Sequence, residues 1–180
     1  MGLAKKRYQP PPRTGMEVFL MLPEGTLAEL LNDVIYMSPS PSFHHQDISG
    51  ELFVQIRAYV KKNKFGVCLS APMDVFLDDR NAVQPDILVM LSDNMLILTD
   101  DGKIKGAPGF IIEILSPGNK KHDTEKKKAL YEKFGVKEYF IIDPDNKETI
   151  SYYLISNKFV RQDAVKGKVK SKLLKKVFTF

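Results

Sequence analysis

Two carboxylates occupy positions where buried strands normally carry apolar side chains. Glu113 lies at the centre of the apolar segment 110–115, and Asp86 immediately precedes the apolar segment 87–91. A buried carboxylate is costly unless a cation or several hydrogen-bond donors compensate its charge. Because paired strands lie about 4.8 Å apart, these two segments, if adjacent, would bring both carboxylates to one divalent cation. Mg²⁺ is held in this way by one or two carboxylates, with water and substrate phosphate completing its shell, and Mn²⁺ is a possible substitute.

A second group of candidate residues follows Glu113 on a segment with helical periodicity, residues 120–134. Asp123, Lys127 and Tyr131 are spaced four residues apart and therefore share one face of an α-helix. We expect the Lys127 ammonium to approach the metal site, where it would position the attacking water and offset phosphate charge. Tyr131 and Asp123 are candidate substrate-binding residues, Tyr131 through a bond to a phosphate oxygen. The alternative is an ordinary Asp–Lys surface pair beside a tyrosine that lies half in the core.

The elements that must position these residues follow an α/β pattern. Ile48, Leu52 and Ile56 recur every four residues, which predicts a long helix that ends near residue 64. A shorter helix is expected over residues 23–31, and the C-terminal segment is expected to add an edge strand. Segments rich in β-branched and aromatic residues predict strands at 34–37, 67–70, 73–77, 86–91, 110–115, 138–142 and 149–155.

Length and composition indicate one globular domain. Of the 180 residues, 43% are apolar and 27% are charged, as in ordinary globular proteins. We expect residues 1–22 to form a mobile basic and proline-rich arm and residues 23–180 to form a single domain. No apolar run approaches the length of a membrane span or resembles a secretion signal, so we expect a cytoplasmic protein. The single cysteine, Cys68, excludes an intrachain disulfide and a cysteine-based zinc site.

Positive charge is concentrated at the C-terminus. The net charge is +5, and residues 156–180 carry eight basic side chains and one acidic side chain. The rest of the chain is slightly acidic. Such a segment suits contact with a polyanion such as nucleic acid. A solvated edge strand would have the same composition, so the segment alone does not decide between the two.

Several stretches together resemble a known family. In chain order they are YMSPSP, HHQDISGEL, APMDVFLDD, VQPDILVM, GAPGFIIEILSPGNKKHD and KKKALYEKFGVKEYFIIDPD. The sequence of acid, second acid, lysine and tyrosine that they contain is similar to the PD-(D/E)XK nuclease superfamily, and more closely to the Uma-two (Uma2) family of restriction-endonuclease-like proteins. The resemblance covers roughly residues 24–155 and implies a restriction-endonuclease-like fold, a central mixed β-sheet flanked by helices, with Mg²⁺-dependent nuclease geometry.

The chain departs from the superfamily pattern at one position, and the resemblance adds two candidate site residues. The superfamily places a lysine two residues after the second acid, where this chain has Leu115. The helix lysine, Lys127, is the expected replacement. Glu29 matches an acid common in the family and is a candidate for the outer shell of the metal, or else a solvated helix residue. His45 is a candidate substrate-binding residue, or else a histidine satisfied within the protein.

These observations favour one function and leave two alternatives open. The first hypothesis is a Mg²⁺-dependent endonuclease acting on DNA, with Asp86, Glu113 and Lys127 as catalytic residues and Asp86, Glu113 and Glu29 at the metal. A homodimer is possible, since cleavage of both strands requires two active sites. The second hypothesis is a nuclease-fold protein that binds nucleic acid in a regulatory role without turnover. The third is a sheet protein in which Glu113 is neutral or paired with Lys127 and no metal binds.

Overall fold

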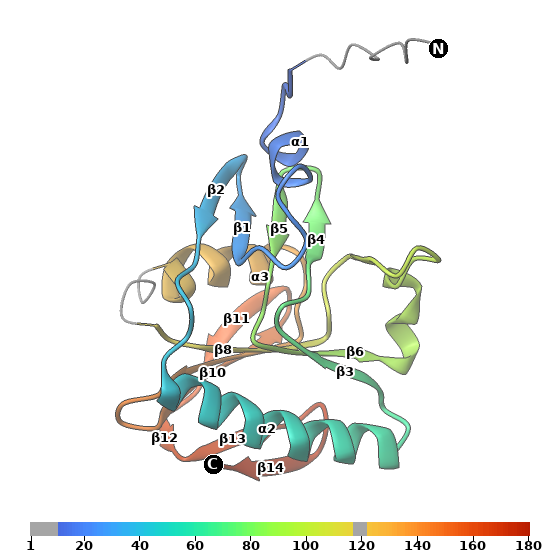
Figure 1. Ribbon diagram of the computed structural model, residues 1–180. Helices are drawn as coiled ribbons and strands as arrows, with labels where there is room; N and C mark the ends of the chain where they lie inside the picture. Colours follow the sequence, from blue (N-terminus) through green and yellow to red (C-terminus); the bar gives the residue numbers. More distant parts are fainter. Residues whose placement is uncertain (1–10, 117–121) are drawn as a thin grey trace, which may run out of the picture.

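The computed structural model describes residues 11–116 and 122–180, the side chains of residues 122–124 excepted. Its centre is a seven-stranded sheet in the order β11-β10-β9-β8-β6-β3, with β12 paired to β10 (Figure 1). Strands β8 and β9 pair in parallel and the other neighbours in the sheet are antiparallel. The sheet is therefore mixed, as predicted. Its strands are β3 (Gly66–Ser70), β6 (Ile87–Leu91), β8 (Phe110–Ile114), β9 (Glu138–Asp143), β10 (Glu148–Ile155), β11 (Lys158–Arg161) and β12 (Val165–Lys166).

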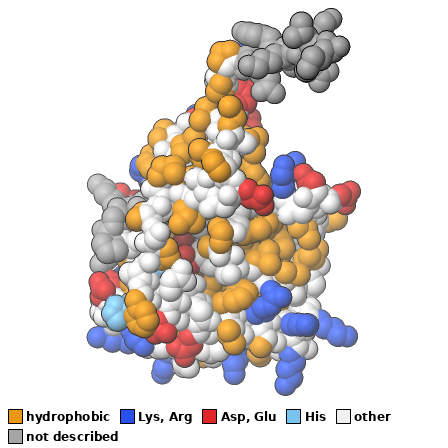
Figure 2. Space-filling view, viewed as in Figure 1, with side chains coloured by type: hydrophobic (Ala, Val, Ile, Leu, Met, Phe, Trp, Pro, Cys, Tyr) orange, Lys and Arg blue, Asp and Glu red, His pale blue; other side chains and the backbone are white. Residues whose placement is uncertain are grey.

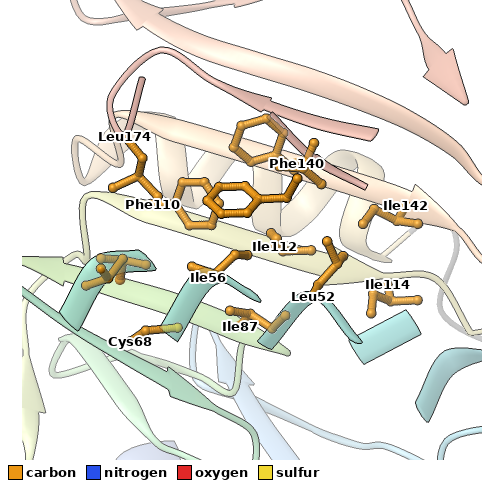
Figure 3. Packing of buried hydrophobic residues seen from close by; sticks show 14 of the residues in the cluster. Leu52, Ile56, Cys68, Ile87, Phe110, Ile112, Ile114, Phe140, Ile142 and Leu174 are labelled. Atoms are coloured by element: carbon orange, nitrogen blue, oxygen red, sulfur yellow. The ribbon is translucent and has the colours of Figure 1, made fainter. Parts of the chain in front are cut away.

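Helix α2 (Phe43–Lys62) covers one face of this sheet. Its N-cap is Ser42, whose side chain accepts the His45 backbone N–H, and it buries residues that recur every four positions. Leu52 and Ile56 from this helix pack over Ile87 and Ile112 of β6 and β8 (Figure 3). The predicted long helix is thus confirmed, because its apolar stripe meets a continuous apolar sheet face.

The C-terminal residues form a hairpin of their own. Strands β13 (Lys168–Ser171) and β14 (Lys176–Thr179) pair only with each other and lie beside α2 (Figure 1). The C-terminal segment does add an edge strand to the central sheet, but this strand is β11, with the short β12 also paired to β10. The terminal hairpin does not join that sheet, and its Val169 and Phe178 enter the core beneath α2.

A second, five-stranded sheet lies over the opposite face, together with α3 (Lys128–Lys133). Its order is β2-β1-β5-β4-β7, and it contributes apolar side chains to a second core. The short 3₁₀ helix η1 (Ser92–Ile97) connects β6 to β7. The strands are β1 (Ala28–Leu31), β2 (Val34–Met37), β4 (Val75–Asp78), β5 (Asn81–Val83) and β7 (Ile104–Lys105).

The predicted helix over residues 23–31 is wrong. Ala28–Leu31 forms β1, which is fully buried because β2 and β5 pair with it on either side. Asn32 and Asp33 both have positive φ and connect β1 to β2 as a two-residue turn, the geometry that joins antiparallel strands. Four residues between turns are too few for a stable helix, whatever their propensity. The consequence for the site is that Glu29 comes from a strand.

Part of the predicted N-terminal arm is ordered. Helix α1 (Gly15–Phe19) begins with a capping box between Thr14 and Glu17 and buries Phe19 against the five-stranded sheet. Residues 1–10 lie outside the described part of the chain. Within residues 11–116 and 122–180, no helix combines the length and hydropathy that crossing a membrane would require.

Candidate active site

Glu113 points from the central strand β8 into a network of buried polar side chains. Only 3% of its surface is exposed. Its Oε1 atom lies 2.8 Å from Lys127 Nζ and accepts a hydrogen bond of 2.7 Å from the Tyr131 hydroxyl. The positive charge that a buried carboxylate needs is therefore supplied by Lys127 of the same chain. This pairing was one of the alternatives that the sequence left open, and by itself it neither requires nor excludes a metal.

Lys127 and Tyr131 reach Glu113 from the same side because they stand four residues apart. The predicted continuous helix is instead a π-helical segment, η2 (His122–Lys127), followed by α3. Lys127 is the last residue of the π segment and Tyr131 lies in α3, so the two still share a helix face. Such π turns are frequent at functional sites. The predicted role of Asp123 lies outside what is described, since no side chain is described at this position.

Tyr131 does not have the surface that a phosphate contact requires. Its side chain is completely buried and its ring packs against Tyr139. Burial raises the pKa of Tyr131 well above its usual value, and the negative charge of Glu113 raises it further. The hydroxyl therefore remains a hydrogen-bond donor at any working pH. The contact that the structure shows for Tyr131 is with Glu113, and its contact with substrate stays a prediction.

Glu29 joins the same network from the second sheet. Its Oε1 atom lies 2.9 Å from Lys127 Nζ and accepts a 2.9 Å hydrogen bond from the Gln84 backbone N–H. With 4% of its surface exposed, Glu29 is not the solvated helix residue of the alternative prediction. One ammonium thus contacts carboxylates from two different sheets, β1 and β8.

Gln84 is a site residue that sequence reasoning missed. Its side-chain amide donates to the Thr26 carbonyl oxygen at 3.0 Å and to Asp74 Oδ1 at 2.8 Å, while its backbone N–H binds Glu29. Gln84 therefore holds the second sheet next to Asp86, which follows it by two positions. No local signal identified it, because its partners Thr26, Glu29 and Asp74 are distant in the sequence and a polar residue before a strand is often solvated.

Asp86 lies at the entrance of β6, next to the strand that carries Glu113. The pairing of Ile87 with Ile112 places Asp86 beside Glu113 one step beyond the ladder. Asp86 Oδ2 accepts a 2.7 Å hydrogen bond from the Ile114 backbone N–H. The same oxygen lies 3.2 Å from His45 Nε2, so the buried histidine at the start of α2 faces Asp86.

The two carboxylates open into one cavity. A cavity of about 200 Å³ is lined by both Asp86 and Glu113, and Lys127 forms part of its wall. Glu29, His45 and Gln84 line it too, together with backbone and small side chains around Pro39, Ala71 and Ser116. The convergence predicted for Asp86, Glu113 and Lys127 is therefore present in the structure.

The donor set suits a hard cation. Among the described residues, no three Asp, Glu, His or Cys side chains are arranged as a complete metal site. Mg²⁺, however, needs only one or two carboxylates when water and phosphate supply its other ligands. Asp86 and Glu113 fit that requirement, because both are acids on adjoining strands and border one cavity. Glu29 contacts Lys127 and the Gln84 backbone N–H, so it would belong to the outer shell of the metal and not bind the ion directly.

Comparisons with known proteins agree with the geometry. A family model described as "Uma2: Putative restriction endonuclease" matches residues 16–174. A crystal structure from Anabaena variabilis ATCC 29413, described as "a putative nuclease belonging to DUF820", is similar with a TM-score of 0.69 and 26% sequence identity. The match covers 83% of this chain and 84% of that one. No curated protein matches the sequence significantly.

Proposed function

This chain belongs to the Uma2 family and has its restriction-endonuclease-like fold, and from that premise we propose that it is a metal-dependent nuclease that hydrolyses phosphodiester bonds of DNA. The observation that carries the proposal is the shared cavity of Asp86 and Glu113 with the Lys127 ammonium in its wall. Two acids on neighbouring strands and one cation beside them form a suitable arrangement for binding a metal ion and a phosphate together.

Each residue has a distinct role in the proposed reaction. Asp86 and Glu113 would hold Mg²⁺, which when bound would lower the pKa of a coordinated water and stabilise charge on the phosphoryl oxygens. The Ile114 N–H and His45 both contact Asp86 Oδ2 and so fix that carboxylate toward the cavity. Tyr131 fixes Glu113 in the same way.

Lys127 takes the role of the lysine that the superfamily places on the strand. The corresponding strand position is Leu115, which is buried in the second core and carries no charge. The Lys127 ammonium reaches Glu113 from the helix instead, at 2.8 Å. Its positive charge at the cavity wall would attract the phosphate and position the attacking water.

The basic C-terminal region would hold the nucleic-acid backbone. Lys168 and Lys170 point outward on β13, alternating with the buried Val169 and Ser171. Lys and Arg side chains gather in the lower part of the molecule in Figure 2, where Figure 1 places α2 and the β13–β14 hairpin. Backbone contacts of this kind are nonspecific and weaken steeply with salt.

Metal-dependent cleavage tests the proposal directly. Plasmid and linear DNA are incubated with the protein in Mg²⁺, in Mn²⁺ and in EDTA, alongside Asp86→Ala and Lys127→Ala. We expect nicking or linearisation by the wild type only when metal is present, and none by Asp86→Ala. Circular dichroism establishes that the variants are folded. If the wild type cuts nothing that Asp86→Ala leaves intact, the chain is not a nuclease of this kind.

A second function is favoured by Leu115. If the strand lysine is needed for turnover and Lys127 does not replace it, the fold would bind nucleic acid without cutting it. DNA binding would then be salt-sensitive, insensitive to EDTA, and unaccompanied by cleavage.

The two functions also differ in the oligomeric state they require, since cutting both strands of DNA requires two active sites. Light scattering with and without DNA measures the molar mass, and a homodimer would support the nuclease.

A further inference from the structure

The site already contains one cation, the ammonium of Lys127, between two carboxylates. We infer that Lys127 occupies the position that a second metal ion takes in two-metal nucleases, so that this protein binds a single divalent cation. The inference deepens the proposed function and rests on its metal site at Asp86 and Glu113. It concerns how many metal ions bind, which can be measured without any DNA.

The position of the ammonium carries the inference. Two-metal sites hold their ions about 3.5–4 Å apart and use a carboxylate in common. Here Glu113 is the common carboxylate, because it borders the cavity with Asp86 and also contacts Lys127 Nζ at 2.8 Å. Glu29 of β1 contacts the same Nζ at 2.9 Å. Lys127 thus bridges Glu29 and Glu113 as a metal ion would.

Lys127 is fixed in that position. Its side chain is 4% exposed, and it stands at the junction of η2 and α3, where Leu130 and Tyr131 of the next turn are buried. A surface lysine could move aside for a metal ion at little cost. A buried one cannot leave two carboxylates without exposing them to each other.

The charge of the side chains around the cavity also indicates a single divalent cation. The described side chains around the cavity include three carboxylates, Asp86, Glu113 and Glu29, and one ammonium, Lys127. These four side chains together carry a charge of −2, which one divalent cation neutralises, whereas two would leave them with an excess of +2. Replacing Lys127 by a neutral residue makes the sum −3 and restores the bridging pair of carboxylates.

Counting bound Mn²⁺ in the absence of DNA tests the inference. Isothermal titration calorimetry gives the number of Mn²⁺ ions bound per chain, and electron paramagnetic resonance detects the magnetic coupling between two ions that share a carboxylate. We expect one ion and no coupling in the wild type, and two coupled ions in Lys127→Met. The double variant Lys127→Met, Glu29→Gln should return to one ion, because the second site then lacks a carboxylate.

The outcomes separate this inference from the proposed nuclease function. A wild type that binds two coupled ions overturns the inference even if it cleaves DNA. A wild type that binds one ion and does not cleave supports the inference and contradicts the nuclease. A wild type that binds none overturns both. If Lys127→Met does not fold, the wild-type count still decides, and Lys127→Arg, which keeps the charge, should continue to bind one.

Discussion

The Tyr131 hydroxyl donates its 2.7 Å hydrogen bond to the same Glu113 oxygen that lies 2.8 Å from the Lys127 ammonium. Two donors on one atom hold the carboxylate in a single orientation, and both come from the helix that follows its strand. Tyr131→Phe should lower the free energy of unfolding by about 1–3 kcal/mol, because a buried charged acceptor loses one of its donors. It should also reduce kcat roughly tenfold with little change in KM, since Glu113 then orients the metal less well.

Tyr153→Phe is the matched control for that variant. The Tyr153 hydroxyl donates a bond of the same length, 2.7 Å, to the Lys170 carbonyl oxygen, away from the cavity. Tyr153→Phe should lower the free energy of unfolding but leave kcat unchanged. Equal effects of the two variants on kcat would mean that Tyr131 contributes to the fold alone.

Lys127→Met should be strongly destabilising when no metal is present. Removing one partner of a buried ion pair typically costs about 3–5 kcal/mol, because the remaining charge is left uncompensated. Urea unfolding in EDTA measures the loss. Adding Glu113→Gln to this variant should recover part of it by removing one of the uncompensated charges. A loss below about 1 kcal/mol, as for an exposed pair, would contradict the buried network.

Glu138 should make stability depend on pH. It begins β9 and accepts hydrogen bonds from the Ser171 hydroxyl and from the backbone N–H groups of Lys172 and Leu173, which attach the C-terminal hairpin. Burial nevertheless raises the pKa of Glu138 above its usual 4.5. The folded state therefore favours the protonated form. This contribution is complete below pH 4.5 and is lost as the pH rises through the folded-state value.

The comparison that isolates this effect is with Glu138→Gln, which does not titrate. Unfolding free energies of the two proteins are measured from pH 4 to pH 7. We expect the wild type to lose stability relative to the variant as the pH rises. A relative stability that is constant or that increases would show that the three donors outweigh the cost of burial.

The exposed lysines of β13 should control the salt dependence of DNA binding. Lys168→Ala with Lys170→Ala should reduce the slope of log K against log salt by about 1.8, since each phosphate contact contributes about 0.9. Fluorescence anisotropy at several salt concentrations measures the slope. Lys103→Ala with Lys105→Ala, at β7 in the five-stranded sheet, should leave it unchanged. An equal decrease in both variants would argue against a binding surface on the hairpin.

Patterns that depend on neighbouring residues were predicted correctly from the sequence. The stripe of Ile48, Leu52 and Ile56 predicted the long helix, and short segments rich in β-branched and aromatic residues predicted most strands of the central sheet. The resemblance to the Uma2 family is confirmed by the family match. The site acids could also be chosen in advance, since a carboxylate within an apolar strand needs compensation from elsewhere in the chain.

Features that depend on distant contacts could not be predicted. Residues 28–31 have helix-forming side chains, but pairing with β2 and β5 makes them a strand. The C-terminal hairpin folds on α2 instead of extending the sheet because its apolar side chains enter that core. Neither the contact of His45 with Asp86 nor that of Gln84 with Glu29 has a local signal, since 41 and 55 positions separate the partners.

The sequence by itself determined which residues could carry charge into the interior, and that Lys127 and Tyr131 share a face. The tertiary structure decided that the ammonium of Lys127 meets carboxylates from two sheets at once. The physical reason is that helical spacing is fixed by the backbone over a few residues. Compensation of buried charge, in contrast, depends on which segments pack together, and packing is a property of the whole chain.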